Sequence, residues 1–451
     1  MPRIENNLTE GSVLKKLIVF ALPFLASNII QSFYNVADML IVGNFSGAES
    51  MSGVNIGGQI TFILTNIIIG LCVGATVLIG QYIGRGKKDA LKSVTATIIT
   101  MLLILSVSIS VVMLIFRVPI LHLIQTPPES FEESKRYLTV TVSGLVFIFG
   151  YNAFAAILQG MGDSKHPFYF VLASCITNVI LDFLLVGFFG LGALGAALAT
   201  VASQALSVVL CISYMVRNNF QFDFRRKSFR IDKEQLKLIL KIGLPTSVQN
   251  GVTSLSFLFI TMMVNTFGVY ASAAVGAAGK FNSFAFMPAI AISASIASMS
   301  AQNIGAGKMD RAVSACRIGT VFAVVIMYTF FFFVQMFPDE ILRIFADDER
   351  MIESGVTYVR TFSFDLLFVP FIFCINGFLN GGGHTFFSLM NGMLSSLLLR
   401  VPMAYILGVK FNMGLFGVGL GAPAASSGAL IIVIIYLLSG KWKVNKIAHA
   451  D

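Results

Sequence analysis

The stretch QYIGRGKKDA at residues 81–90 recurs as QNIGAGKMDRA at residues 302–312. Three further pairs lie at a nearly constant separation of about 221 residues: Leu22-Pro23 with Leu244-Pro245, QGMGDS from Gln159 with NGGGHT from Asn380, and GLGALGAA from Gly190 with NMGLFGVG from Asn412. Four matched pairs in one order indicate an internal repeat that divides the chain into two similar halves.

The composition is that of a polytopic membrane protein. Of its 451 residues, 56 % are hydrophobic and only 12 % are charged, about half the charged share of a soluble domain. A membrane-spanning helix needs about 20 mostly apolar residues, so this chain has enough apolar residues for twelve. Disordered, collagen-like, disulfide-scaffold and ordinary cytosolic classes are excluded.

Hydropathy predicts twelve spans, six in each half of the chain. Their approximate ranges are 13–43, 53–80, 93–116, 137–161, 168–188, 194–216, 242–267, 273–301, 318–337, 356–380, 387–408 and 414–438. Six is an even number, so both halves enter the membrane from the same side and the repeat is parallel. We predict an all-α integral membrane protein with an N-terminal lobe (1–216), a cytoplasmic linker (217–241), a C-terminal lobe (242–438) and a cytoplasmic tail (439–451).

The basic residues predict the orientation of these spans. Twenty-two of the 31 Lys and Arg fall on the side of the two termini, seven on the opposite side and two within spans. The positive-inside rule therefore predicts that both termini lie in the cytoplasm, and the expected location is the plasma (cell inner) membrane. The net charge of +9 is explained by this asymmetry, so no nucleic-acid partner is expected. The polar start of the chain is not that of a removable signal peptide, and residues 13–42 are expected to be retained as the first span.

Five ionisable residues fall inside predicted spans, where each costs on the order of 3 kcal/mol at a helix centre. They are Asp38, Asp182, Lys280, Asp365 and Arg400. The N-terminal lobe holds Asp38 and Asp182 and no basic residue in a span. Two such carboxyl groups must keep their protons or take a mobile cation, unless they serve only as hydrogen-bonded packing groups.

Neutral oxygen-bearing residues accompany the two acids. Asn178 lies one helical turn before Asp182 and hence on the same helix face, and Thr200 reaches a comparable depth in the next span. Carboxylate, amide and hydroxyl oxygens are hard ligands, which suit Na⁺ or a proton rather than a soft metal. The four histidines and five cysteines have no ligand or disulfide spacing, so no metal site or cofactor is expected.

Other residues have two interpretations each. Tyr137 and Asn152 in the fourth span either line a substrate cavity or make ordinary hydrogen bonds between helices. Lys280, Asp365 and Arg400 either form an ion pair or set the electrostatics of a cavity that binds anionic substrates. Pro23 breaks the helix ladder and is either a fixed kink or a conformational hinge.

The sequence resembles the MATE (multidrug and toxic compound extrusion) transporters over essentially its whole length, and most resembles their DinF-like branch. The resemblance rests on the 6+6 repeat, YNVADMLIVG at 34–43, NVILDFLLVGFFGLGALGAALATVASQ at 178–204 and FMP at 286–288. It implies that Asp38, Asn178, Asp182 and Thr200 form the cation site. It also implies that the first span bends near Pro23 when the cation binds.

The expected function is a cation-coupled antiporter, driven by H⁺ or Na⁺. It would export amphipathic, mostly cationic drugs or toxic metabolites by alternating access, as a monomer in the bilayer. No nucleotide-binding motif is found, so an ion gradient must supply the energy. The alternative is a lipid-linked oligosaccharide flippase of the related superfamily, for which more spans and more cavity arginines are expected. No nucleophile with a base and no metal cluster points to an enzyme.

Overall fold

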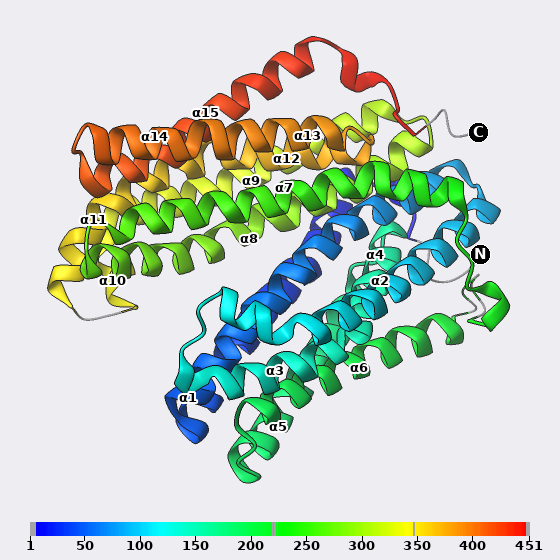
Figure 1. The fold of residues 1–451 in the computed structure, drawn as a ribbon. Coiled ribbons are helices and arrows are strands. Elements are labelled where there is room, and N and C mark those ends of the chain that lie inside the picture. The colour runs from blue at the N-terminus through cyan, green and yellow to red at the C-terminus, as the bar shows by residue number, and fades with distance from the viewer. Residues whose placement is uncertain (1–5, 219, 221, 223, 346–347, 448–451) are drawn as a thin grey trace. The chain divides into compact units, whose positions relative to one another are not determined.

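The structure is a computed structural model that describes residues 6–218, 220, 222, 224–345 and 348–447 (Figure 1). It is all-α: the described residues contain no β-strand. The predicted cytoplasmic ends at 1–5 and 448–451 lie outside the described residues. In chain order the elements are α1 (Val13–Arg85), α2 (Lys88–Leu123), η1 (Pro128–Ser130), α3 (Phe131–Ser143), α4 (Leu145–Gly160), α5 (Lys165–Asp182), η2 (Phe183–Phe188), α6 (Gly192–Arg217), η3 (Arg226–Ser228), α7 (Lys233–Asn265), α8 (Val269–Gly305), α9 (Met309–Met336), α10 (Pro338–Arg343), α11 (Glu349–Ser363), η4 (Phe364–Leu367), α12 (Val369–Gly381), α13 (Thr385–Met393), η5 (Leu394–Arg400), α14 (Val401–Tyr405), η6 (Ile406–Lys410), α15 (Gly414–Leu438) and η7 (Lys441–Lys443).

The first helix, α1, contains two spans. Its 73 residues would extend about 110 Å at 1.5 Å per residue, far beyond the roughly 30 Å of a hydrocarbon core. The helix is interrupted at Gly47, whose φ of 78° and ψ of −176° are not helical. The repeat has a matching break at Gly268 (φ 102°, ψ 175°), between α7 and α8. Only glycine adopts this backbone conformation without strain, which explains a glycine at both positions.

The remaining helices are compatible with the twelve predicted spans. Among the described residues, nine helices are long and apolar enough to cross a membrane, and two bent pairs also qualify. The pairs are η1–α3 with α4, bent by 48°, and α11–η4 with α12, bent by 41°. Counting α1 as two spans then gives twelve. Pro370 is the second residue of α12, at the bend between η4 and α12, where its missing N–H prevents a continuous helix.

The chain divides into two compact units, which we describe separately. The first is built mainly from Leu22–Gly243, and the second from Leu8–Ala21 together with the chain after Leu244. In the second unit Leu17 is fully buried among residues of α8. Helix α1 therefore begins in one unit and continues in the other, and the change falls beside Pro23.

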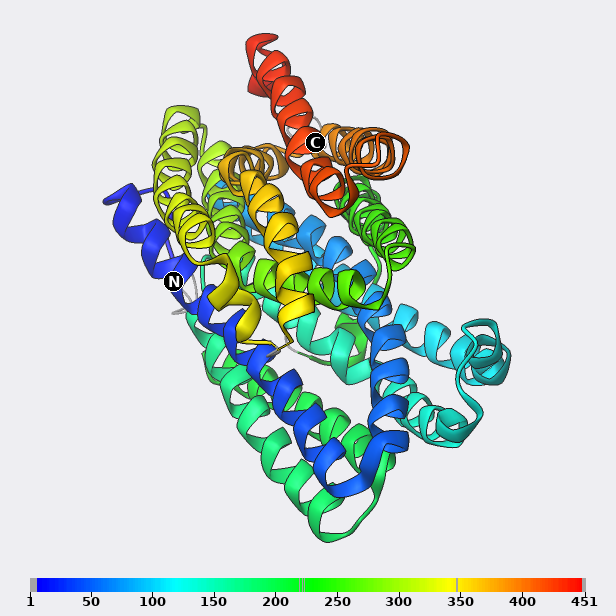
Figure 2. The same cartoon turned by 90° about the vertical axis from the view of Figure 1, so that its left-hand side faces the viewer.

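The helices of each unit lie side by side (Figures 1 and 2), and small residues lie at their contacts. In the first unit, the fully buried residues Ala193, Ala196 and Ala197 of α6 lie in one apolar cluster with Val186 of η2. In the second unit, Ala274 and other alanines of α8 pack in a cluster with residues of α10 and α11. Small side chains are typical of helix contacts in membranes, because association there depends on close packing rather than on the hydrophobic effect.

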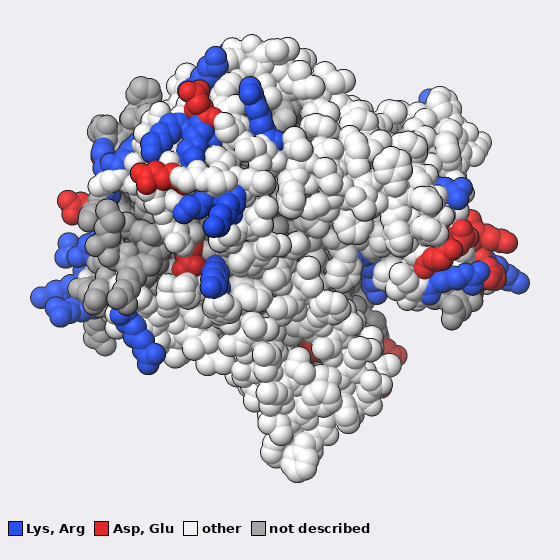
Figure 3. Space-filling model, turned by 180° about the vertical axis from the view of Figure 1, so that it is seen from behind, with Lys and Arg blue, Asp and Glu red and all other residues white. Residues whose placement is uncertain are grey.

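The molecular surface is suited to lipid. On the face shown in Figure 3, charged side chains gather at the ends, and the broad surface between them carries almost none. Large apolar side chains are more than half exposed, among them Phe62, Ile115 and Val325. Such a surface is costly in water and favourable in a bilayer.

The segment between α6 and α7 is attached to the first unit through Asp232. The Ser93 hydroxyl donates a hydrogen bond of 2.7 Å to Asp232 Oδ2, and the Asp232 N–H donates to Thr97 Oγ1 at 3.1 Å. Asp232 Oδ1 accepts from the backbone N–H groups of Glu234 and Gln235, at 2.9 and 3.3 Å, so it caps the start of α7. The hydrogen bond from Ser93 holds the pKa of the Asp232 carboxyl below its usual value.

We expect Asp232→Ala to destabilise the protein at pH 7 by about 1 kcal/mol, the typical value of an N-cap side chain. Because its folded-state pKa is lowered, Asp232 contributes this stability at neutral pH and loses it as the pH falls below about 4. Thermal unfolding in detergent at both pH values measures the effect. Glu234→Ala, which removes an exposed neighbouring carboxylate, is the control. Equal unfolding temperatures for wild type and Asp232→Ala at pH 7 would contradict this role.

Candidate cation-binding site

Helices α1 and α5 bring two buried carboxyl groups together in the first unit. Asp38 of α1 is 6 % exposed, and Asp182 at the end of α5 is fully buried. The two carboxyl groups are close enough to interact directly. Asn178, one turn before Asp182, is 1 % exposed and lies on the same face of α5. These three residues were predicted from the sequence, and the structure brings them to one region.

A π-helical segment follows Asp182 immediately. Helix α5 ends at Asp182 and continues as η2, in which each backbone hydrogen bond spans one more residue than in an α-helix. Helix α6 packs closely on this segment, because a side chain on Gly195 would meet the backbone of Leu185 at 3.0 Å. Such π segments are often found at functional sites, where they alter the direction of nearby side chains.

Two tyrosines and Thr200 surround the carboxyl pair. Tyr34 lies one turn before Asp38 on α1, and its hydroxyl is 3.2 Å from Thr200 Oγ1 of α6. Tyr137 of α3 is 6 % exposed and interacts electrostatically with both Asp38 and Asp182. The structure therefore adds the predicted residues Thr200 and Tyr137 to the cluster. Oxygen atoms from four helices meet there.

Most polar atoms at the centre of this cluster have no hydrogen-bond partner. They are Asp38 Oδ1, both oxygens of Asp182, and the amide oxygen and nitrogen of Asn178. In addition, the ion pairs formed by the described residues include neither acid. Buried polar atoms are nearly always paired, so this group of unpartnered oxygens has the donor chemistry to hold a proton or a small hard cation.

Among the described residues, no hydrogen bond joins the Asn152 side chain to this cluster. Its side-chain Nδ2 donates to the carbonyl oxygen of Ile148 at 2.7 Å, one turn earlier on its own helix α4. This bond is the local structural arrangement of an asparagine within a helix. A role for Asn152 in a substrate cavity remains a prediction.

The predicted charged residues of the second unit differ in their surroundings. Lys280 of α8 is exposed, whereas Asp365 of η4 is 1 % exposed. Ser426 of α15 hydrogen-bonds Asp365, and Arg400 interacts with it electrostatically. Among the ion pairs of the described residues, none within 4.0 Å joins Asp365 to Arg400 or Lys280. The guanidinium of Arg400 instead lies over the ring of Phe257, 4.8 Å from its centroid.

The repeat and the buried cluster can be compared with known families. The MatE family model matches this chain twice, at residues 23–184 and 245–406, which are the two halves of the internal repeat. Together these segments cover more than half of the chain. The protein belongs to the MATE family. The members of this family are multidrug efflux transporters of the membrane.

Curated MATE relatives align with almost the whole chain. The probable multidrug resistance protein YoeA of Bacillus subtilis (strain 168) is 29 % identical over 99 % of this chain and 98 % of its own length. The probable multidrug resistance protein NorM of Thermotoga maritima (strain MSB8) is 27 % identical over 95 % of this chain and 93 % of its own. A MATE crystal structure in the bent conformation shares the fold, with a TM-score of 0.91, 23 % identity and 97 % coverage of both chains.

Pro23, which resemblance to MATE transporters assigns to a hinge, lies inside α1. Proline has no N–H, so one carbonyl of the preceding turn has no intrahelical donor. The Ser27 hydroxyl, one turn later, donates to the Pro23 carbonyl oxygen at 2.9 Å. Pro23 also lies two residues after Ala21, where α1 passes from one unit to the other. Both features are compatible with a hinge.

Sequence reasoning did not single out Tyr34. Its aromatic ring is unremarkable in a chain with 12 % aromatic residues, and phenol is not an obvious ligand for an alkali cation. A signal was nevertheless present, because Tyr34 precedes Asp38 by four residues, the same spacing that relates Asn178 to Asp182. Examining each buried acid for polar neighbours one turn away would have found it.

Proposed function

We propose that this protein is a cation-coupled antiporter that exports amphipathic, mostly cationic compounds by alternating access. Protons or Na⁺ would bind at Asp38 and Asp182, with Asn178 and Thr200 as neutral oxygen ligands. Cation binding and substrate binding would oppose each other, so the inward flow of the cation drives substrate out. The branch is that of the DinF-like transporters, and the protein would act as a monomer.

One observation carries this proposal: the carboxyl groups of Asp38 and Asp182 are buried together, with unpartnered oxygens and no ion-pair partner among the described residues. A buried carboxylate without compensation is strongly unfavourable. A pair of them is stable when protonated or when bound to a mobile cation, and both states couple the protein to an ion gradient.

Three further features support the proposal. Relatives that align over nearly the full length are named for multidrug resistance, which favours drug export over the oligosaccharide flippase. The excess of Lys and Arg on the side of the termini supports cytoplasmic ends in a plasma membrane. One elementary charge crossing 100 mV supplies about 2.3 kcal/mol, enough for a concentration ratio of roughly 50-fold.

Ethidium transport into everted membrane vesicles that contain the full chain tests the proposal. One arm imposes a pH gradient without Na⁺, and the other imposes a Na⁺ gradient at equal pH on both sides. We expect the wild type to accumulate ethidium in at least one arm and Asp38→Asn to fail in that same arm. The arm that succeeds identifies the coupling ion.

Asp89→Asn provides the matched control, because it makes the same chemical change at an exposed residue near the start of α2. It should transport as the wild type does. Accumulation by the wild type in neither arm would refute cation-coupled export, as would undiminished accumulation by Asp38→Asn. Transport of a lipid-linked sugar without ethidium transport would favour the flippase.

A further inference from the structure

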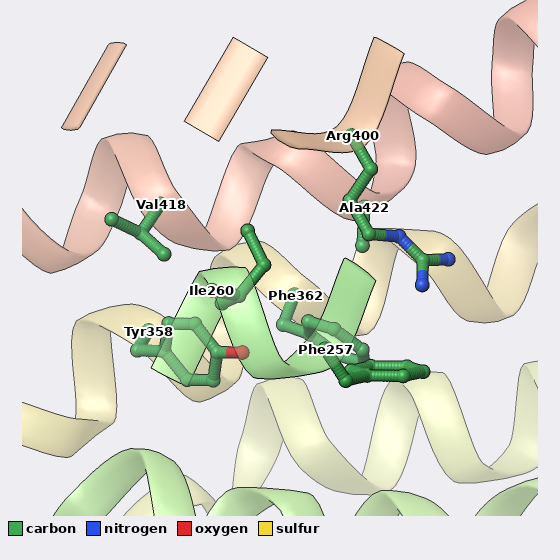
Figure 4. Close-up of a pocket in the computed structure, with 7 residues that line it drawn as sticks. All are labelled: Phe257, Ile260, Tyr358, Phe362, Arg400, Val418 and Ala422. Carbon is green, nitrogen blue, oxygen red and sulfur yellow. The ribbon is translucent and has the colours of Figure 1, made fainter. Parts of the chain in front are cut away.

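A small cavity lies within the second unit, apart from the carboxyl pair. Its volume is about 10 Å³, roughly the space that one water-sized group needs. The lining includes Phe257 and Ile260 of α7, Tyr358 and Phe362 of α11, Arg400 of η5 and Ala422 of α15 (Figure 4). The polar groups of this lining are the guanidinium of Arg400 and the hydroxyl of Tyr358, and the other side chains are apolar.

Arg400 presents unused hydrogen-bond donors in this region. Its Nε and Nη1 atoms are buried and have no hydrogen-bond partner, and Figure 4 shows Phe257 beneath its guanidinium. Asp365 is the nearby carboxylate, but no ion pair within 4.0 Å joins it to Arg400 among the described residues. A buried charged donor without an acceptor costs several kcal/mol by order of magnitude, so an anion that accepts from these atoms would bind favourably.

The repeat relates this cavity to the carboxyl pair of the first unit. Tyr358 is the counterpart of Tyr137, and Ala422 is the counterpart of Thr200. When the two halves are aligned, Asp38 corresponds to the adjacent apolar residues Phe259 and Ile260 of α7. The same place in the two halves therefore holds an acidic group in one and an apolar residue in the other.

The π-helical segments show which residue of the second half corresponds to Asn178. Gly162 is matched by Gly383, 221 residues later, whereas Gly192 is matched by Gly414, 222 residues later. All four glycines have positive φ, so the second half has one extra residue between these two positions. The second half contains an additional π-helical segment, η5, which accommodates the extra residue. With the insertion in η5, Arg400 at its end corresponds to Asn178.

The charge at this place in the repeat is thus inverted. By the same register Asp182 corresponds to Ala404, which is fully buried. The first half presents two carboxyl groups and neutral oxygens, whereas the cavity of the second half presents a guanidinium on an apolar lining. A site with the first composition suits a cation, and one with the second suits an anion that carries an apolar group.

We propose that this cavity is an anion-binding site, in which Arg400 holds the carboxylate of an aromatic acid. A carboxylate oxygen accepts hydrogen bonds from the Nε–H and Nη1–H groups of Arg400, and the cavity has the volume for one such atom. The ring of Phe257, which is 43 % exposed, provides contact for the aromatic part outside the cavity. One guanidinium beside Asp365 favours a singly charged carboxylate over a doubly charged phosphate. The proposal does not depend on cation coupling, because Asp38 and Asp182 belong to the other unit.

Calorimetric titration of the full-length protein in lipid nanodiscs, in a chloride-free buffer, tests this site with benzoate and its neutral analogue benzamide. We expect benzoate to bind at least tenfold more tightly than benzamide. Arg400→Gln should lower benzoate affinity at least tenfold and leave benzamide unchanged. Lys410→Gln, which removes an exposed cation at the end of η6, should bind benzoate as the wild type does.

Arg400→Lys keeps the charge without the planar fork and should show an intermediate affinity. Thermal unfolding verifies that each variant is folded, and the comparison of benzoate with benzamide on the wild type needs no variant. Equal affinity for the two probes, no binding of benzoate, or undiminished benzoate binding by folded Arg400→Gln would each overturn the proposal. None of these results bears on ethidium transport, so the proposed function and this site are tested separately.

Discussion

The double variant Asp38→Asn, Asp182→Asn should impair ion-driven efflux no more than Asp182→Asn does alone. The two carboxyl groups are buried and interact directly, and the proposed function makes them one site for a single cation or a shared proton. Residues that act as a unit give strongly non-additive effects, because the first substitution already removes the function that the second would impair.

The magnitude follows from the loss of coupling. A transporter that moves one charge down a potential of 100 mV can sustain a substrate ratio of up to about 50-fold, and an uncoupled variant cannot exceed unity. Asp182→Asn should therefore reduce the steady-state ethidium ratio in everted vesicles to about one. The doubly substituted protein should give the same value. Amounts of folded protein in the vesicles must be matched for the comparison.

A control replaces Asp182→Asn by Asp310→Asn, both alone and in the double variant with Asp38→Asn. Asp310 lies in the first turn of α9 and outside the carboxyl pair. Asp310→Asn should leave the ethidium ratio unchanged and should not alter the effect of Asp38→Asn. Independent effects of Asp38→Asn and Asp182→Asn, with each variant retaining part of the ratio, would show that the two acids do not form one coupling site.

Gly57→Ala should abolish most transport by displacing Tyr137. A methyl group on Gly57 of α1 would lie 2.5 Å from Tyr137 Cδ1 and 3.3 Å from its Cγ. Alanine normally stabilises a helix by up to about 1 kcal/mol relative to glycine, but overpacking of this kind costs about 1–3 kcal/mol. The ring of Tyr137 must therefore shift from its place beside the two acids. We expect a lower unfolding temperature and a loss of efflux on the order of tenfold, because preorganised sites tolerate little displacement.

The adjacent glycine offers a matched control. A methyl group on Gly58 would lie 4.0 Å from the Tyr137 hydroxyl, an ordinary van der Waals distance, so Gly58→Ala should preserve stability and efflux. In a Tyr137→Ala background, Gly57→Ala should lower neither the unfolding temperature nor efflux any further, because the ring that would clash is already absent. If Gly57→Ala transports as well as Gly58→Ala, the position of Tyr137 does not matter for transport.

Much of the candidate site could be predicted because charge is so rare within the spans. An acid in a hydrophobic run departs from the surrounding composition, and this identified Asp38 and Asp182 directly. Helical periodicity then added Asn178. Tyr34 was missed because an aromatic residue is common in such a chain, and Asn152 could not be judged because its distance from Asp38 depends on how α1 and α4 pack.

The fold could be predicted with similar success for a similar reason. The requirement that a span be long and apolar leaves few alternatives, and the repeat independently divides the spans into two sets of six. Hydropathy could not show that the break between the first two spans lies at Gly47, nor that the fourth and tenth spans bend by 48° and 41°. Those details depend on local backbone geometry and packing, whereas hydropathy reports only how apolar a segment is.

The sequence by itself determined that this chain lies in a membrane, that it has two parallel halves and that one half holds two unpaired acids. These features follow from composition and periodicity, which act along the chain and do not need its folded form. Only the tertiary structure decided that Tyr34 reaches Thr200 and that Arg400 lies on Phe257 and forms no ion pair with Asp365. Such contacts join residues far apart in the sequence, and they depend on the rotation and close packing of whole helices.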